Sequence, residues 1–201
     1  MRRLAFAPLL IAALLGCGER VPRIPAVAPN EVIVAFGDSL TYGTGAAESE
    51  SYPAVLAQLI GRRVVRAGVP GEVTAQGLAR IEQVIEAHRP ALMIVCLGGN
   101  DMLRKVDETQ VKNNLGGIIR AIQSRGIAVV LVGVPKPALI TSAPAFYGEL
   151  ANEFGIPYEG KVVTDVMYQL ELKADPIHPN AKGYRRMAEA IAELLKKAGA
   201  I

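Results

Sequence analysis

The chain has no tryptophan, and aromatic residues make up only 5% of its 201 residues. Aromatic side chains interleaved with basic ones are typical of surfaces that stack on nucleic acid bases. The chain also lacks any run of lysine and arginine, and its formal net charge is only +3. The sequence therefore predicts no nucleic-acid partner.

Cysteine and histidine are scarce as well, with two residues of each. No CxxC motif is present, and His88 and His178 lie far apart, so the sequence has no metal or dithiol motif. Cys96 lies in an apolar stretch and is expected to be a small core residue. Glycine fingerprints of nucleotide-binding loops are also absent. We therefore expect no metal and no cofactor.

The first residues have the pattern of an export signal. A short basic start, Met1-Arg2-Arg3, precedes an apolar stretch from Leu4 to Leu15 that is too short to span a bilayer comfortably. Leu14-Leu15-Gly16-Cys17 then resembles a bacterial lipobox, in which cleavage leaves a lipidated cysteine. An ordinary signal peptide with an incidental cysteine, or an uncut anchor, would fit the same pattern. We expect residues 1–16 to be a signal peptide and Cys17 to be lipidated, which predicts an exported, periplasmic protein held to a membrane by its lipid anchor.

The stretch after Cys17 is rich in proline and has no helical period. Pro22, Pro25 and Pro29 predict a tether over residues 17–30. The remaining length, residues 31–201, fits one folded domain, and we expect a monomer.

Strand-like and helix-like segments alternate through this domain. Continuous apolar runs predict buried strands at residues 32–36, 63–67, 91–97 and 127–132, with a short last strand at 156–158. Helical spacing of apolar residues predicts helices at residues 52–60, 73–88, 108–125, 145–154 and 182–197. This alternation predicts a doubly wound α/β domain with a parallel sheet and helices on both faces. The proline-rich stretch Pro135 to Pro144 is predicted to be a loop at the rim of a pocket.

Three glycine-rich turns follow the first three predicted strands. They are Gly37-Asp38-Ser39-Leu40, Gly68-Val69-Pro70-Gly71-Glu72 and Gly98-Gly99-Asn100-Asp101. Ligands bind outside the carboxyl ends of the strands in open α/β sheets. If the first strand lies between the second and the third, all three turns meet at that edge.

Ser39 is the candidate nucleophile at this edge, and it needs a base because a serine hydroxyl is a poor nucleophile at neutral pH. His88 ends a predicted helix, which puts it at the opposite edge as a cation stabilised by the helix dipole. His178 lies just before the last predicted helix, and Asp175, three residues earlier, could orient its ring. Elimination therefore favours a Ser39–His178–Asp175 triad.

A serine nucleophile also needs hydrogen-bond donors for the oxyanion that its attack creates. The backbone N–H groups of Ser39 and Gly71 lie at turns, and Asn100 offers a side-chain amide. Each alone would be ordinary turn chemistry, but their places after successive strands favour an oxyanion hole. We interpret Asp38 and Asp101 as local hydrogen-bonding residues rather than catalysts.

In this order, the segments resemble the four sequence blocks of the SGNH, or GDSL, hydrolase family. The matching segments are Gly37-Asp38-Ser39-Leu40, Pro70-Gly71-Glu72, Gly98-Gly99-Asn100-Asp101 and Asp175-Pro176-Ile177-His178. The Gly-x-Ser-x-Gly elbow of the α/β-hydrolases is absent. The segments Thr74 to Arg80, Leu97 to Asp101 and Ile177 to Asn180 further resemble a branch of exported bacterial thioesterases, arylesterases and lysophospholipases.

The resemblance implies a flavodoxin-like, three-layer α/β/α sandwich with a five-stranded parallel sheet. It also implies a serine esterase that acts on a small acyl-ester, thioester or lipid substrate through an acyl-enzyme on Ser39. The chain departs from the branch between Val134 and Phe146, where the branch has a mobile loop that helps bind acyl chains. The acyl-length preference therefore stays open. Two alternatives also stay open: a deacetylase of cell-envelope glycans, and a lipoprotein that binds lipid or glycan without turnover.

Overall fold

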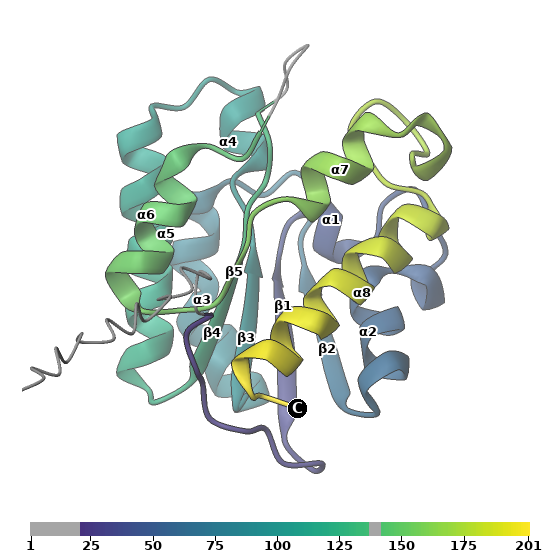
Figure 1. The fold of residues 1–201 in the computed structure, drawn as a ribbon. Coiled ribbons are helices and arrows are strands. Elements are labelled where there is room, and N and C mark those ends of the chain that lie inside the picture. Colours follow the sequence, from purple (N-terminus) through teal and green to yellow (C-terminus); the bar gives the residue numbers. More distant parts are fainter. Residues whose placement is uncertain (1–20, 137–141) are drawn as a thin grey trace, which may run out of the picture.

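The computed structural model describes residues 21–136 and 142–201 (Figure 1). Within them, five parallel strands form one sheet in the order β2-β1-β3-β4-β5. The strands are β1 (Val32–Gly37), β2 (Arg63–Gly68), β3 (Leu92–Cys96), β4 (Ala128–Val132) and β5 (Tyr158–Glu159). The predicted signal peptide and Cys17 lie outside the described residues.

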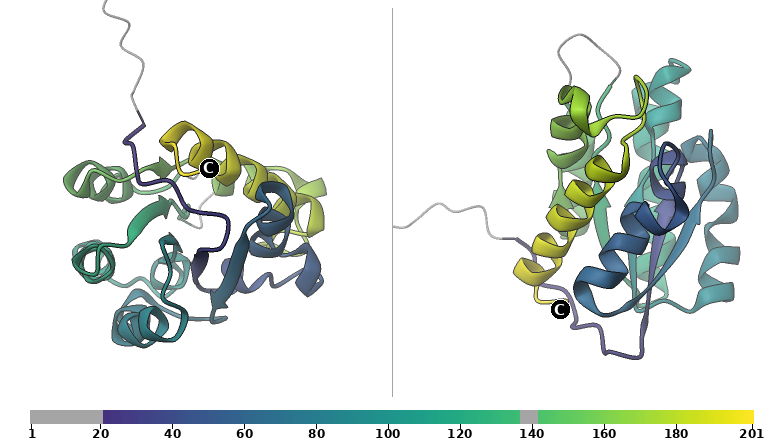
Figure 2. Two further views of the ribbon diagram at one scale, coloured as in Figure 1. Left: turned by 90° about the horizontal axis from the view of Figure 1, so that it is seen from below. Right: turned by 90° about the vertical axis from the view of Figure 1, so that its right-hand side faces the viewer.

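Helices cover both faces of the sheet, as Figures 1 and 2 show. On one face lie α2 (Tyr52–Ile60), α8 (Ala181–Ala198) and α7 (Val162–Tyr168). On the other lie α3 (Thr74–His88), α5 (Glu108–Ser124) and α6 (Ala145–Phe154). The predicted three-layer α/β/α sandwich with a five-stranded parallel sheet is confirmed.

Local sequence explains where these elements begin and which face they bury. Every residue of β3 is buried, as a strand covered on both faces requires. Helix α5 begins where the Asp107 carboxylate accepts the backbone N–H groups of Thr109 and Gln110. Its apolar stripe is wholly buried and consists of Val111, Leu115, Ile118, Ile119 and Ile122. Helix α8 starts in the same way at Asn180 and ends at Gly199, in the left-handed region.

The register of the sheet brings the glycine-rich turns to one edge, as predicted. Gly37, the last residue of β1, pairs with Gly68 of β2 on one side and with Cys96 of β3 on the other. A β-carbon on Gly37 would collide with the carbonyl oxygen of Cys96 and with the Thr41 hydroxyl. Glycine is therefore needed here for the turn that carries Ser39 to lie against β3.

The structure has three short helices and two 3₁₀ turns in the described residues that the sequence did not predict. Helices α1 (Ser39–Tyr42) and α4 (Gly99–Leu103) begin inside predicted turns, whereas α7 and two 3₁₀ turns, η1 (Glu48–Glu50) and η2 (Leu170–Leu172), lie where the sequence predicted no element. The sequence did not predict them because one or two turns of helix are too short to produce a helical hydrophobic period.

The described part of the predicted tether is bound to the domain rather than separate from it. The backbone N–H groups of Ile24 and Val27 donate to the carbonyl oxygens of Ala198 and Ala200, at 3.1 and 2.8 Å. Val27 is buried. This segment runs along the end of the sheet opposite the glycine-rich turns (Figures 1 and 2). In the part of the chain that the structure describes, no helix combines the length and apolar character needed to cross a membrane.

Candidate active site

Ser39, His178 and Asp175 form a hydrogen-bonded row at the carboxyl edge of the sheet. Ser39 starts α1 directly after β1, and the other two residues lie in the segment between η2 and α8. His178 Nε2 is 3.1 Å from Ser39 Oγ, and His178 Nδ1 is 2.7 Å from Asp175 Oδ2. Both are hydrogen-bond lengths, in the order nucleophile, base and orienting carboxylate. The structure therefore brings together the three residues that the sequence predicted as a triad.

The segment that carries the imidazole is closed on itself by hydrogen bonds. Asp175 Oδ1 accepts the backbone N–H groups of Ile177 and His178, each at 2.9 Å. The Ala174 N–H donates to the carbonyl oxygen of His178 at 3.0 Å. Desolvation raises the pKa of the Asp175 carboxyl, but the hydrogen bonds from the His178 ring and from the two backbone N–H groups together hold that pKa below its usual value. The carboxylate therefore stays ionised and keeps the ring in place.

Asp38 is the residue before Ser39 and is almost completely buried, with 2% of its surface exposed. Its Oδ1 accepts the N–H of Leu40 at 3.0 Å and caps α1. Burial raises the pKa of the Asp38 carboxyl from 3.8 to about 7, the charges of Glu72 and Asp101 add to the rise, and the Leu40 hydrogen bond opposes it. Asp38 is thus a hydrogen-bonding residue, as predicted, and one that titrates near neutral pH.

The Asn100 amide lies between two of the glycine-rich turns. Its Nδ2 donates to the carbonyl oxygen of Glu72 at 3.0 Å and to Asp38 Oδ2 at 3.3 Å. Both amide hydrogens are therefore engaged, and an oxyanion would have to replace one of these acceptors. The turn before Asn100 is fixed by a buried hydrogen bond, in which the Tyr147 hydroxyl donates to the carbonyl oxygen of Leu97 at 2.8 Å. Gly98, at φ +120°, lies against the same hydroxyl.

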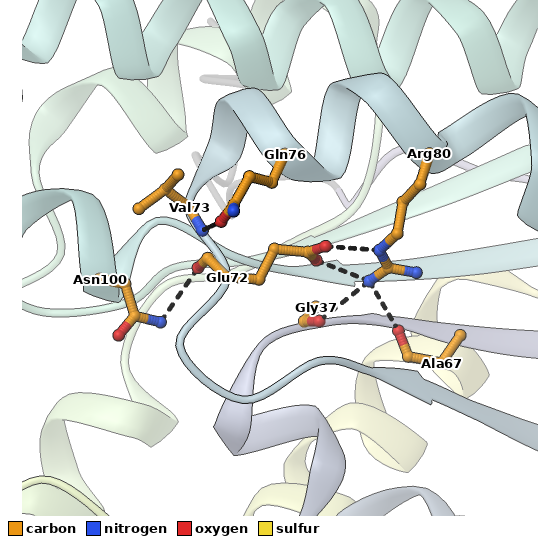
Figure 3. Close-up of polar contacts among 7 residues, drawn as sticks. All are labelled: Gly37, Ala67, Glu72, Val73, Gln76, Arg80 and Asn100. Atoms are coloured by element: carbon orange, nitrogen blue, oxygen red, sulfur yellow. Dashed lines mark hydrogen bonds and ion pairs between the residues drawn. The ribbon is translucent and has the colours of Figure 1, made fainter.

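Gly71 lies on the turn between β2 and α3, with a φ of +79° that favours glycine. Arg104 Nη2 donates to its carbonyl oxygen at 3.0 Å. Gly71 is not among the described residues that line the pocket at the triad. Its connection to the site runs through the next residue, Glu72, whose carbonyl oxygen binds the Asn100 amide (Figure 3).

Asp101 is buried and hydrogen-bonded, but its partner is not local. Its carboxylate accepts the backbone N–H of Thr74, at 3.1 and 2.9 Å, and the Thr74 hydroxyl, at 2.6 Å. Asn114 in turn donates to that hydroxyl at 3.0 Å. Asp101 therefore fastens the turn after β3 to the start of α3, across 27 residues of sequence.

A pocket of about 380 Å³ opens beside the triad. Ser39, Asn100 and His178 are among its lining residues. The remaining lining is mainly apolar and includes Leu40, Leu103, Val134, Pro135, Val163, Met167 and Ile177. The described start of the proline-rich loop thus forms part of the rim, as predicted, whereas residues 137–141 of that loop lie outside the described residues. The apolar side chains thus share one pocket with Ser39.

The remaining scarce residues lie away from this pocket. His88 is the last residue of α3, at the opposite edge of the sheet, as predicted. Cys96 is a buried, free thiol, and burial raises its pKa well above the usual value. Among the residues that the structure describes, no cluster of histidine, cysteine, aspartate and glutamate could hold a metal ion.

The comparisons with known proteins agree with this geometry. A family model described as the GDSL-like lipase/acylhydrolase family matches residues 35–186, which include both histidines, Ser39, Gly71, Asn100 and Asp175. The chain belongs to this family. Esterase TesA of Pseudomonas aeruginosa is 28% identical to this chain over 182 residues. The matched region covers 84% of this chain and 90% of TesA. Thioesterase 1/protease 1/lysophospholipase L1 of Escherichia coli is 29% identical over 177 residues, covering 84% of this chain and 85% of that protein.

A solved structure supports the same assignment. AlinE4, described as an SGNH-hydrolase family esterase, is 33% identical, with a TM-score of 0.65 over 86% of this chain and 98% of AlinE4. The family predicted from the four sequence blocks is therefore confirmed, and the names of its relatives fall in the predicted thioesterase and lysophospholipase branch.

Two further features of this GDSL family member were missed at the level of sequence. One is the Tyr147 hydroxyl beneath the asparagine turn, and the other is an ion pair between Glu72 and Arg80. Tyr147 looks like an ordinary aromatic on the apolar face of its helix, so its sequence gives no signal of a polar role. Arg80 was noted only as part of a segment that resembles the family branch.

Proposed function

We propose that the chain is a serine esterase that hydrolyses carboxylic esters or thioesters through an acyl-enzyme on Ser39. The observation that carries the proposal is the row from Ser39 Oγ through His178 to Asp175, with hydrogen bonds of 3.1 and 2.7 Å. Membership in a family of lipases and acylhydrolases supports the same reaction class.

In the first half-reaction, Ser39 Oγ attacks the acyl carbon while His178 Nε2 takes the hydroxyl proton. Asp175 accepts the Nδ1–H of the ring, which fixes the tautomer that leaves Nε2 free to act as the base. The protonated His178 then gives its proton to the departing alcohol or thiol. In the second half-reaction His178 takes a proton from water as the water oxygen attacks the acyl carbon, and His178 then returns that proton to Ser39 Oγ as the ester bond breaks and the acid is released.

The tetrahedral intermediates carry a negative oxygen that needs donors already in place. We assign this role to the backbone N–H groups of Ser39 and Gly71 and to the Asn100 amide. Of the two acceptors that Asn100 Nδ2 now has, Asp38 Oδ2 is the more distant, at 3.3 Å. That hydrogen is therefore the one that turns to the oxyanion.

The substrate class is an ester or thioester with an apolar acyl group. The pocket beside Ser39 has a mainly apolar lining, and burial of hydrocarbon there contributes about 25 cal/mol for each Å² removed from water. The relatives carry the names esterase, thioesterase and lysophospholipase, which agree with acyl groups of this kind.

The test is hydrolysis of p-nitrophenyl esters and acyl thioesters of increasing chain length by the protein from residue 18 onward. Ser39→Ala should lower kcat by about 10⁴-fold or more, because the covalent route is lost. Ser124→Ala is the matched control, since Ser124 is an exposed serine at the end of α5 and should leave kcat unchanged. Wild-type turnover in Ser39→Ala would refute the assignment.

The same panel separates the alternatives. Faster release of acetate from acetylated sugars than from longer acyl esters would favour a glycan deacetylase. Failure of a serine-reactive phosphonate to label Ser39, together with no turnover of any ester, would favour a binding protein without catalysis.

We further propose that the protein is an exported, periplasmic lipoprotein, and a monomer. Export and lipidation are supported by the basic start, the apolar stretch and the lipobox-like Leu14-Leu15-Gly16-Cys17, and a monomer by a length that fits one folded domain. Mass spectrometry of the N-terminal peptide from membrane fractions should find Cys17 as the first residue, carrying lipid, and Cys17→Ala should abolish both the lipid and the cleavage before residue 17. An unmodified Cys17 in a membrane-bound protein would instead favour an uncut anchor.

A further inference from the structure

A buried ion pair between Glu72 and Arg80 lies next to the Asn100 amide, which donates to the Glu72 carbonyl oxygen (Figure 3). Arg80 Nε and Nη2 bind the two carboxylate oxygens of Glu72, each at 2.6 Å. The Glu72 side chain is 4% exposed and that of Arg80 is 20% exposed. A charge buried to this degree is retained in a fold only with a partner, and the fork-shaped pairing gives this one a fixed geometry.

The same guanidinium also holds the ends of two neighbouring strands. Its Nη2 donates to the carbonyl oxygens of Ala67 in β2, at 3.0 Å, and of Gly37 in β1, at 3.2 Å. Its plane lies over the Phe36 ring, with Cζ 4.1 Å from the ring centroid. Because Gly37 is two residues before Ser39, Arg80 ties the nucleophile turn to the glycine turn that follows β2.

All three proposed oxyanion donors depend on backbone that Arg80 holds. Ser39 follows Gly37, and Gly71 precedes Glu72 in the chain. The Asn100 amide donates to the carbonyl oxygen of Glu72 itself, at 3.0 Å. Arg80 is absent from the described lining of the pocket, so any effect on the reaction acts through these three turns.

We propose that Arg80, paired with Glu72, is a positioning residue that sets the spacing of the three oxyanion donors. This inference rests on the proposed function. In the part of the chain that the structure describes, Arg80 is the side chain that hydrogen-bonds to the ends of both β1 and β2 and to Glu72. Lysine cannot replace it, because an ammonium group is a point charge without the planar fork that reaches a carboxylate and two carbonyls together.

The test measures kcat and KM for Arg80→Met, Arg80→Lys and the double variant Glu72→Gln/Arg80→Met on the best ester of the panel. We expect kcat to fall about 10- to 100-fold with KM near the wild-type value, since the donors are displaced rather than removed. The double variant leaves no unpaired charge buried, so it should fold even if Arg80→Met does not. Arg80→Lys should have a higher melting temperature than Arg80→Met, while its kcat stays below that of the wild type.

Arg125→Met is the matched control. Arg125 forms an ion pair at 2.6 Å with Glu82, which lies on α3 as Arg80 does. This pair is on an exposed surface, far from the turns. Its loss should leave kcat unchanged. A purely structural role for Arg80 would lower the melting temperature of its variants and leave their kcat intact.

The outcomes separate the two proposals. Wild-type kcat in the folded double variant or in Arg80→Lys would overturn the positioning role, while loss of turnover in Ser39→Ala would still support the esterase. A wild-type protein that hydrolyses no ester or thioester would overturn both.

Discussion

The buried carboxyl of Asp38 should make the stability of the protein fall as the pH rises toward neutral. Its pKa is raised from 3.8 to about 7, mainly because 98% burial penalises the charged form. Between these two values the folded state holds a proton that the unfolded chain has already released. The folded state therefore binds more protons than the unfolded state in this window. As a result, the free energy of unfolding decreases as the pH increases.

The size of the effect follows from the shift. A difference of about three pKa units corresponds to about 4 kcal/mol once the pH is above both values. Linkage places about 2.5 kcal/mol of this between pH 5 and pH 8, since at pH 5 part of the loss has already occurred. This is a large share of the 5–15 kcal/mol that stabilises a typical domain.

The assay compares the wild type with Asp38→Asn by urea unfolding across this pH range. Asparagine keeps an acceptor for the Leu40 N–H but cannot titrate. Its lost acceptor toward Asn100 is a cost of about 1 kcal/mol that does not depend on pH. Titrating groups far from Asp38 are common to both proteins, so they cancel in the difference.

We expect Asp38→Asn to gain about 2.5 kcal/mol relative to the wild type as the pH rises from 5 to 8. A difference that stays constant over this range would refute the raised pKa. A difference of the opposite sign would mean that the site favours the carboxylate.

Three further predictions concern the turns at the site. Asn100→Ala should lower kcat about 100- to 1,000-fold with little change in KM, measured on the best ester, because one oxyanion donor is lost. Gly37→Ala should abolish soluble folded protein in expression and circular dichroism assays, because its β-carbon would overlap the Cys96 carbonyl. Tyr147→Phe should lower the free energy of unfolding by about 1–3 kcal/mol in urea titrations, since the buried carbonyl of Leu97 loses its donor.

The sequence predicted the long elements well because their hydrophobic patterns are local. Helices α2 and α6 have the predicted bounds, and β1 and β4 differ from prediction by one residue each. The triad was predictable for a different reason. With only two histidines, and one of them at a helix end on the wrong edge, chain order alone left His178 as the base for Ser39.

The contacts that hold the site could not be predicted in the same way. Asp101 looked like a turn residue, and its partner Thr74 lies 27 positions away, on a helix that only the sheet order brings near. The Glu72–Arg80 pair is eight residues apart, which is not a helical spacing for contact. The ion pair forms because the side chain of Glu72, which precedes α3, extends along that helix as far as Arg80. Such pairs depend on the three-dimensional path of the turns, which hydrophobic periodicity does not encode.

Asp38 contacts the Asn100 amide directly, and Arg80 is connected to it through Glu72. Asn100 Nδ2 has one acceptor in the Glu72 carbonyl, whose residue Arg80 holds, and the other in the Asp38 carboxyl. The first fixes where the amide lies, and the second occupies the hydrogen that the oxyanion requires. Protonation of Asp38 removes the negative charge that competes with the oxyanion for this hydrogen. The raised pKa of Asp38 therefore has a consequence beyond stability: a buried aspartate next to the nucleophile opposes the oxyanion least when it is neutral.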